Sequence, residues 1–247
     1  MDIVPVIDVL RGMVVRGVGG RRNEYRPIQS VLTWSAVPAD VAAAYRQHFR
    51  ASTLYLADLD AILDRRPHVA LYSDLARAGF LLWVDAGVRS VNDAAAVLAA
   101  GVETAIVGLE SCPSPAVLTE LVQQFGPSPL MFSLDLRDGV PMLPSGWPPM
   151  NPSEIAKTAL AVGFRRLLVL DLSDVGTSTG GRTDGLLQTI RDIAPEAQLV
   201  AGGGVRGVDD LERLSNLGVD AVLVASALHD GRLMPADLER FQRSGPP

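Results

Sequence analysis

The chain has 247 residues, of which 48% are hydrophobic, with a formal net charge of −6 and a single cysteine, Cys112. The negative charge argues against nucleic acids or anionic membranes as partners, and one cysteine excludes a disulfide framework. The N-terminus lacks a signal-peptide pattern and no apolar stretch approaches the roughly 20 residues of a membrane span, so we expect a cytoplasmic protein.

Short apolar runs alternate with Ala- and Leu-rich helical patterns along the whole chain. The expected strands are residues 3–7, 53–57, 81–84, 104–107, 130–134, 166–170, 198–201 and 221–224. The expected helices are residues 39–49, 69–78, 91–100, 115–125, 152–162, 185–194, 208–217 and 235–241. Near-continuous apolar strands indicate a parallel sheet that is covered on both faces. Eight such α/β units in a chain of this length predict a (β/α)8 TIM barrel, with a doubly wound open sheet as the alternative.

Three strand ends in the first half of the chain are repeated in the second half, in the same order. The matching pairs are residues 7–12 with 134–139, 54–59 with 167–172, and 85–89 with 202–206. A repeat of this kind indicates two half-barrels of four βα units each. The two halves close one barrel, so we expect a single domain over residues 1–247, with half-barrels at about 1–126 and 127–247.

Carboxylates lie at five expected strand ends, where barrels of this kind place their catalytic and binding residues. They are Asp8, Asp58, Asp85, Asp135 and Asp171. The repeat makes Asp8 and Asp135 symmetry mates on the first and fifth strands, facing each other across the mouth. Two facing acids suit general acid–base catalysis, because one can hold a proton while the other accepts one. Asp85 is a candidate third catalytic carboxylate. The alternative for any such Asp is capping of the following loop through backbone N–H groups.

A glycine-rich turn follows the seventh expected strand and leads into a helix that begins near Val208. Gly203 and Gly204 let the backbone approach an oxyanion and present successive N–H groups to it. Ala225 and Ser226, after the eighth strand, add amides and a hydroxyl. The sequence therefore predicts a phosphate site beside the last two strands.

The equivalent place in the first half has a different composition. Gly87 and Arg89 offer an amide and a guanidinium, but Asp85 replaces the first glycine and Leu109 stands where the second half has Ser226. A carboxylate about 6 Å from a phosphate costs on the order of 3 kcal/mol per unit of phosphate charge. We expect this half-site to bind phosphate weakly or to bind a different group.

The numbers of lysine and histidine residues limit the types of site that the chain can form. Lys157 is the only lysine and lies in a helical pattern, which excludes a P-loop and argues against Schiff-base chemistry. The three histidines are widely spaced and form no metal-ligand pattern, so we expect no metal site.

Several motifs together resemble the histidine-biosynthesis isomerase and cyclase superfamily, in particular its ribonucleotide isomerase. They are Val6-Ile7-Asp8 with Arg11-Gly12, Ala57-Asp58-Leu59-Asp60-Ala61, Ser133-Leu134-Asp135, Gly146-Trp147, Ala201-Gly202-Gly203-Gly204-Val205 and Ala227-Leu228-His229-Asp230-Gly231. The resemblance covers essentially the whole chain. It implies a barrel of two half-barrels and an Amadori rearrangement of a phosphorylated ribonucleotide.

The resemblance also implies roles for individual residues. Asp8 matches the general base that takes the C2 proton of the opened aminoaldose, and Asp135 matches the general acid that protonates the ring oxygen. Trp147 matches an aromatic residue that stacks on the planar part of the substrate; the alternative is a hydrophobic anchor for its loop. The two proton transfers require no cofactor, and the implied partner is a phosphorylated small molecule.

The chain departs from the family pattern after its sixth expected strand. Leu170 replaces a catalytic-site hydroxyl and Val175 replaces a helper Asp, although Asp174 lies next to it. An arginine-rich loop over residues 21–26, which includes Arg21, is either a lid that closes on an anionic substrate or a solvated loop. These departures favour a divergent paralogue with a changed substrate.

Three functions fit these features. The first is an isomerase that acts on a phosphorylated sugar or ribonucleotide through Asp8 and Asp135. The second is the same proton chemistry in the biosynthesis of a methanopterin-type one-carbon cofactor, with an aromatic part of the substrate over Trp147. The third is a barrel without catalysis that binds a phosphorylated ligand. The sequence contains no indication of the oligomeric state.

Overall fold

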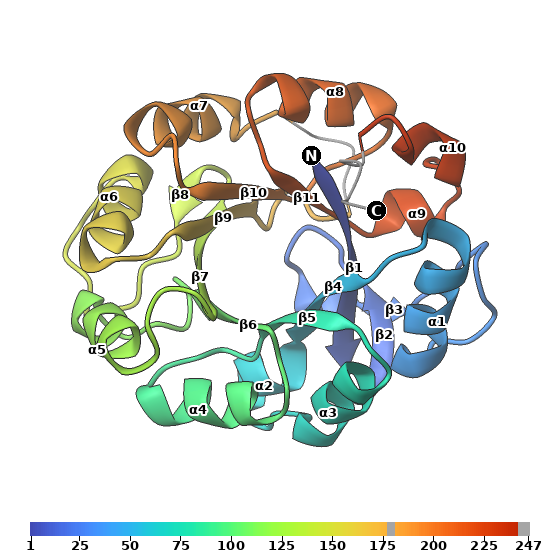
Figure 1. The fold of residues 1–247 in the computed structure, drawn as a ribbon, viewed down its shortest axis with the longest axis horizontal. Coiled ribbons are helices and arrows are strands. Elements are labelled where there is room, and N and C mark those ends of the chain that lie inside the picture. Colours follow the sequence, from blue (N-terminus) through green and yellow to red (C-terminus); the bar gives the residue numbers. More distant parts are fainter. Residues whose placement is uncertain (177–180, 242–247) are drawn as a thin grey trace.

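Eight parallel strands close into a barrel in the computed structural model, which describes residues 1–176 and 181–241 (Figure 1). The strands are β1 (Asp2–Leu10), β4 (Thr53–Asp58), β5 (Leu81–Asp85), β6 (Thr104–Gly108), β7 (Leu130–Arg137), β9 (Arg166–Asp171), β10 (Gln198–Gly202) and β11 (Ala221–Val224). Neighbouring strands pair in chain order, and β11 pairs with β1 to complete the ring. This closure confirms the predicted (β/α)8 barrel and excludes an open sheet, whose edge strands stay unpaired.

Helices surround the barrel and cover the outer faces of its strands (Figure 1). They are α1 (Pro38–Phe49), α3 (Val69–Arg77), α4 (Val91–Ala99), α5 (Pro115–Phe125), α6 (Pro152–Val162), α7 (Asp184–Ile193), α8 (Val208–Asn216) and α10 (Pro235–Leu238). Their bounds lie within a few residues of the predicted ones, because local signals such as the capping box of Asn151 and Glu154 start them. Two short helices, α2 (Leu59–Asp64) and α9 (Ser226–His229), were not predicted. Within the described residues, no helix combines the length and apolar character that crossing a membrane requires.

Side chains pack in two layers, one on each side of the barrel wall. The inner layer includes Val4, Tyr55, Trp83, Ile106, Met131, Leu168, Val200 and Leu223. The outer layer fills the space between the strands and the helices. Because successive side chains of a strand point to opposite faces, Leu54 and Leu56 of β4 lie in the outer layer while Tyr55 lies in the inner one. This double burial explains the near-continuous apolar runs of the sequence.

Two tight hairpins extend the barrel at symmetry-related strands. Arg11 and Gly12 have φ angles of 52° and 74°, and Asp138 and Gly139 have φ angles of 53° and 78°. Positive φ at both central residues is typical of a type I′ turn, which joins antiparallel strands through two residues. The turns connect β1 to β2 (Met13–Arg16) and β7 to β8 (Val140–Pro141), and β2 also pairs with β3 (Arg26–Pro27). Strands this short leave no recognisable pattern in the sequence, so none of them was predicted.

Candidate active site

Three of the five strand-end carboxylates point into the barrel. Asp8 of β1, Asp85 of β5 and Asp135 of β7 line one cavity at the carboxyl ends of the strands. Each lies an even number of positions from an inner-layer residue of its strand and so has the same parity, which means that its side chain points to the same face. Asp85, for example, lies two positions after Trp83. The cavity therefore brings the symmetry mates Asp8 and Asp135 together and adds Asp85.

The other two strand-end carboxylates cap loops. Asp58 and Asp171 have the opposite parity along β4 and β9, so their side chains leave the barrel interior. Asp58 Oδ1 accepts a hydrogen bond from the Ala61 amide at 3.1 Å, at the start of α2. Asp171 accepts hydrogen bonds from the amides of Asp138 at 3.1 Å and Gly139 at 2.7 Å, in the β7–β8 turn. Both follow the capping alternative that was weighed for strand-end Asp residues.

The glycine turn after β10 and the start of α9 line the same cavity. Gly203 and Gly204 have φ angles of 92° and 75°, in the region that favours glycine. Space also requires glycine at position 203, because a Cβ there would lie 2.9 Å from the carbonyl oxygen of Asp171. Ala225 and Ser226 lie on the cavity wall beside this turn. Backbone that comes this close to a hollow can direct amide groups at an anion.

Asp8 lies under the loop that follows β2. A Cβ at Gly17 would lie 3.4 Å from Asp8 Oδ2, so this glycine brings the loop directly over the carboxylate. Burial raises the pKa of Asp8 from 3.8 to about 7; Arg22 opposes this increase and Asp85 adds to it. Asp8 can therefore gain or lose a proton near neutral pH, as a general base must.

Asp135 is buried more deeply and hydrogen-bonded more fully. Ser133 Oγ donates to Asp135 Oδ1 at 2.5 Å, and the Glu110 amide donates to Oδ2 at 3.1 Å. Burial raises the pKa of Asp135 well above its ordinary value, and the charges of Glu110 and Asp85 raise it further. A carboxyl that keeps its proton toward neutral pH can act as a general acid.

Asp85 is close to Asp135 across a glycine of β6. A Cβ at Gly108 would lie 2.9 Å from Asp135 Oδ2 and 3.5 Å from Asp85 Oδ2, so the missing side chain leaves room for both carboxylates. Asp85 Oδ1 accepts a hydrogen bond from the Gly87 amide at 3.0 Å. Burial raises the pKa of Asp85 to about 6. The cavity is thus lined by three carboxyl groups whose pKa values are all raised.

Several other cavity residues were not singled out from the sequence. Arg22, in the short 3-10 helix η1 (Arg22–Glu24), forms an ion pair with Glu110, which follows β6. Tyr55 of β4, Tyr25 and Arg232 also line the cavity. Arg22 and Tyr25 belong to the arginine-rich loop over residues 21–26, which the sequence marked as a candidate lid, and Tyr55 has inward parity in β4. Arg232 lies in a loop whose path depends on tertiary packing.

The predicted phosphate contacts of the first half-barrel are not assembled. Gly87 and Arg89 lie outside the lining of the cavity. Arg89 Nη1 donates to the Gly87 carbonyl and Nη2 donates to the Ile62 carbonyl, each at 2.6 Å. The guanidinium is therefore bound to the protein's own backbone, in agreement with the unequal composition of the two half-sites.

Trp147 lies in the core rather than in the cavity. Its side chain is 6% exposed, its Nε1 donates to the Cys112 carbonyl at 2.8 Å, and its ring lies 6.4 Å from that of Phe132. The implied stacking on a substrate is thus replaced by the alternative, a hydrophobic anchor for the loop. The Trp147 ring fills a buried space beside Phe132, and the spacing of residues in the sequence cannot reveal such a space.

Asp174 and Arg21 also lie outside the cavity lining. Asp174 is buried behind the cradle, with its Cβ 3.5 Å from the place of a Cβ at Gly203. Arg21 is exposed and pairs with Glu24 at 2.8 Å. Of the arginine-rich loop, Arg22 and Tyr25 reach the cavity, because the turn at η1 directs them inward while Arg21 stays on the surface.

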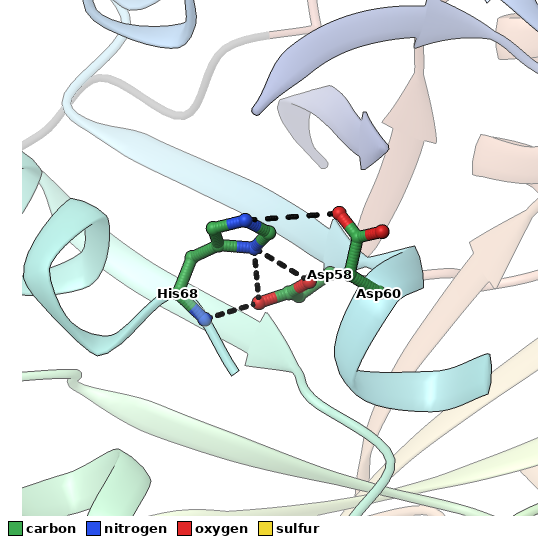
Figure 2. Close-up of side chains that lie close together, drawn as sticks. All are labelled: Asp58, Asp60 and His68. Atoms are coloured by element: carbon green, nitrogen blue, oxygen red, sulfur yellow. Dashed lines mark hydrogen bonds and ion pairs between the residues drawn. The ribbon is translucent and has the colours of Figure 1, made fainter. Parts of the chain in front are cut away.

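A group of possible metal ligands lies outside the cavity, at the rim of the barrel. Figure 2 shows the His68 ring between Asp58 and Asp60, and their ligand atoms lie within 4.8 Å of one another. The spacing of the histidines gave no sign of this group, because two of its members are carboxylates. Their oxygens already accept hydrogen bonds: the His68 amide donates to Asp58 Oδ2 at 2.7 Å, and the Arg11 amide donates to Asp60 Oδ2 at 2.5 Å. The group ties α2, α3 and the β1–β2 turn together, and we assign it no metal.

The fold and the site define a (β/α)8 barrel with a carboxylate-rich cavity at the carboxyl ends of its strands. The family model described as histidine biosynthesis protein matches residues 2–234. The chain belongs to this family, which confirms the resemblance drawn from its motifs.

Relatives extend over nearly the whole chain. An uncharacterised protein of Methanocaldococcus jannaschii is 33% identical over 243 residues, which cover 98% of this chain and 97% of the relative. The 1-(5-phosphoribosyl)-5-((5-phosphoribosylamino)methylideneamino) imidazole-4-carboxamide isomerase of Natronomonas pharaonis is 30% identical over 236 residues, 93% of each chain. The isomerase of the same name from Methanosphaera stadtmanae is 27% identical over 247 residues, 98% of this chain and 100% of the relative. At the level of the family, this chain is an isomerase-type enzyme.

Proposed function

We propose that the protein isomerises a phosphorylated sugar or ribonucleotide by an Amadori-type aldose–ketose rearrangement. The observation that carries this proposal is the convergence of Asp8 and Asp135, from the first and fifth barrel strands, on the cavity that Gly203, Gly204 and Ser226 also line. An acid, a base and an amide-lined anion site in one hollow are the parts that this rearrangement needs.

The chemistry divides between the two carboxyl groups. The substrate phosphate binds the amides of Gly203 and Gly204 and the Ser226 hydroxyl, which positions the sugar between Asp8 and Asp135. Asp135 gives its proton to the ring oxygen as the C1–O bond breaks, which leaves an iminium. Asp8 then removes the C2 proton to form an enaminol. Asp8 returns this proton to C1 while the proton of the C2 hydroxyl passes back to Asp135, which completes the aminoketose and restores both carboxyl groups. Each step is a proton transfer, so neither an oxidant nor a cofactor takes part.

The two departures from the family pattern fit this use of the cavity. Leu170 and Val175 both line it, where a hydroxyl and a carboxylate were expected from the family. Apolar side chains there exclude water and keep the pKa values of the neighbouring carboxyl groups high. Asp8 and Asp135 therefore remain the only pair placed on opposite strands for acid–base work among the described cavity residues.

Genetic complementation tests the substrate. A histidine auxotroph that lacks the ribonucleotide isomerase is transformed with the wild-type gene, Asp8→Asn or Asp135→Asn. Rescue by the wild type alone supports the same substrate as the named relatives, and each variant should lower turnover of the purified enzyme by at least about a hundredfold. Glu120→Gln, an exposed carboxylate of α5, is the matched control. Full turnover by Asp8→Asn contradicts the proposal, provided that circular dichroism shows an unchanged fold.

A paralogue with the same proton chemistry and a different substrate is the second candidate. It is favoured by the Arg89 guanidinium, which is bound to two backbone carbonyls, and by Asp85 at the strand end beside it. The name of the isomerase relatives specifies two phosphoribosyl groups. Failure of a folded wild-type protein to rescue the auxotroph, together with binding of sugar monophosphates, supports this candidate.

A further inference from the structure

The barrel topology gives the cavity two chemically different ends. In the ring of eight strands, β10 and β11 lie diametrically opposite β5 and β6. The cradle of Gly203, Gly204 and Ser226 follows β10 and β11, whereas Asp85 ends β5 and Glu110 follows β6. A ligand held at the cradle by its phosphate therefore extends across the mouth, between Asp8 and Asp135, toward Asp85 and Glu110.

The end at β5 and β6 is rich in hydrogen-bond acceptors. Asp85 is 6% exposed, and among the described residues its Oδ2 has no hydrogen-bond donor. Tyr55 is 3% exposed, and its hydroxyl faces the cavity without a hydrogen bond to any described residue. A polar group that stays unpaired where it meets a hollow is typically satisfied by a ligand or water. Burial raises the pKa of Tyr55 well above its ordinary value, and the charges of Asp85, Asp135, Asp8 and Glu110 raise it further.

A phosphate does not suit this end. Arg89, the arginine that the half-barrel repeat places here, donates to the Gly87 and Ile62 carbonyls. Arg22 is the cation that lies among the carboxylates, and it forms an ion pair with Glu110. Asp85 therefore faces the cavity without an ion pair among the described residues, and an incoming anion would meet its negative charge in a buried setting.

We propose that this end of the cavity binds a protonated amine, so that the substrate is a phosphate monoester with an ammonium group at its far end. An ammonium has three donors, which match Asp85 Oδ2, the Glu110 carboxylate and the Tyr55 oxygen. The Arg22 guanidinium already occupies part of this place as an internal cation. The inference rests on the proposed function, because it takes the cradle at β10 and β11 as the phosphate site.

Matched ligands test the inference on the full chain by isothermal titration calorimetry at pH 7. Glucosamine 6-phosphate carries an amine where glucose 6-phosphate carries a hydroxyl. We expect glucosamine 6-phosphate to bind at least about tenfold more tightly. Fructose 1,6-bisphosphate should bind less tightly than fructose 6-phosphate. Asp85→Asn should reduce the amine preference to about twofold or less and leave the affinity for glucose 6-phosphate unchanged or higher. Glu120→Gln is the control that keeps the preference.

The outcomes separate this inference from the proposed function. Binding of both monophosphates with equal affinity, or an amine preference that survives in Asp85→Asn, overturns the inference and leaves the isomerase proposal standing. Absence of binding by every sugar phosphate overturns the phosphate cradle and both proposals with it. Tyr55→Phe gives a second test if Asp85→Asn fails to fold, because it should lower the amine preference without affecting the phosphate. The preference should also fall at pH 5, because the pKa of Asp85 is about 6.

Discussion

At the scale of single residues, the alternation of side chains along a strand decides which carboxylates face the cavity. Asp8 and Asp85 share the inner face of the barrel and have pKa values raised by burial to about 7 and about 6. Asp58 and Asp171 end their strands on the outer face, where backbone amides donate to them. A displacement of one residue thus separates a carboxylate that lines the cavity from one that caps a loop, because alternate side chains point to opposite faces.

The raised pKa of Asp8 predicts how the rate depends on pH. A general base must be unprotonated, so kcat/KM should rise with a slope of one and level off near pH 7, then fall where Asp135 loses its proton. Arg22 lowers the pKa of Asp8, so Arg22→Gln should move the rising limb to higher pH. Arg21→Gln, the exposed neighbour, should leave that limb in place. A limb unmoved by Arg22→Gln in rate profiles from pH 5 to 9 contradicts this role for Asp8.

At the scale of elements, two loops meet over the cavity. The Gly19 amide, after β2, donates to the Val175 carbonyl, after β9, at 2.7 Å. Gly176 and Gly17 are in such close contact that a Cβ at Gly176 would lie 2.0 Å from the Gly17 carbonyl oxygen. The contact needs two glycines because the backbones themselves touch. It holds the loop over Asp8.

Gly176→Ala should open this contact. The added Cβ cannot fit against Gly17, so the two loops must separate, and we expect kcat/KM to fall by about tenfold, since misplaced loops raise the barrier. Gly139→Ala is the matched control. Gly139 has a similar positive φ, but a Cβ added there would lie in open space. The substitution should therefore lower stability only by the cost of holding alanine at positive φ, about 1 kcal/mol. Equal losses of activity in the two variants would indicate that backbone strain, not loop contact, matters.

At the scale of the whole molecule, a buried hydrogen-bond chain lies at the seam where the last strand meets the first. Tyr45 of α1 donates to the Val6 carbonyl of β1 at 3.0 Å, and its hydroxyl lies 2.8 Å from His229 Nε2 in α9. His229 Nδ1 lies 2.9 Å from Ser30 Oγ. Together with the β1–β11 ladder, this chain joins segments from both ends of the sequence.

The seam predicts sensitivity to acid. Burial lowers the pKa of His229 from 6.5 to about 4, so between these values the unfolded chain binds a proton that the folded protein does not. The contribution of His229 to the free energy of unfolding should therefore fall by about 3 kcal/mol as the pH drops from 6.5 to 4, whereas the buried carboxyl groups of the cavity change the total in the opposite direction. In urea unfolding curves at the two pH values, the free-energy difference between the wild type and His229→Gln should change by this amount. His48→Gln alters an exposed histidine of α1 and should leave its difference from the wild type unchanged, and an equal change in both variants refutes the assignment.

The order of elements and the barrel itself followed from the sequence, because apolar runs and helical periodicity are local consequences of burial on two layers. Motif and repeat also led to Asp8, Asp135 and the Gly203–Gly204 turn, which the structure gathers around one cavity. Tertiary structure alone decided which side chains of the loops enter that cavity. Arg22 does so while Arg21, Arg89 and Trp147 do not, because the path of a loop and the space beneath it depend on elements distant in the chain.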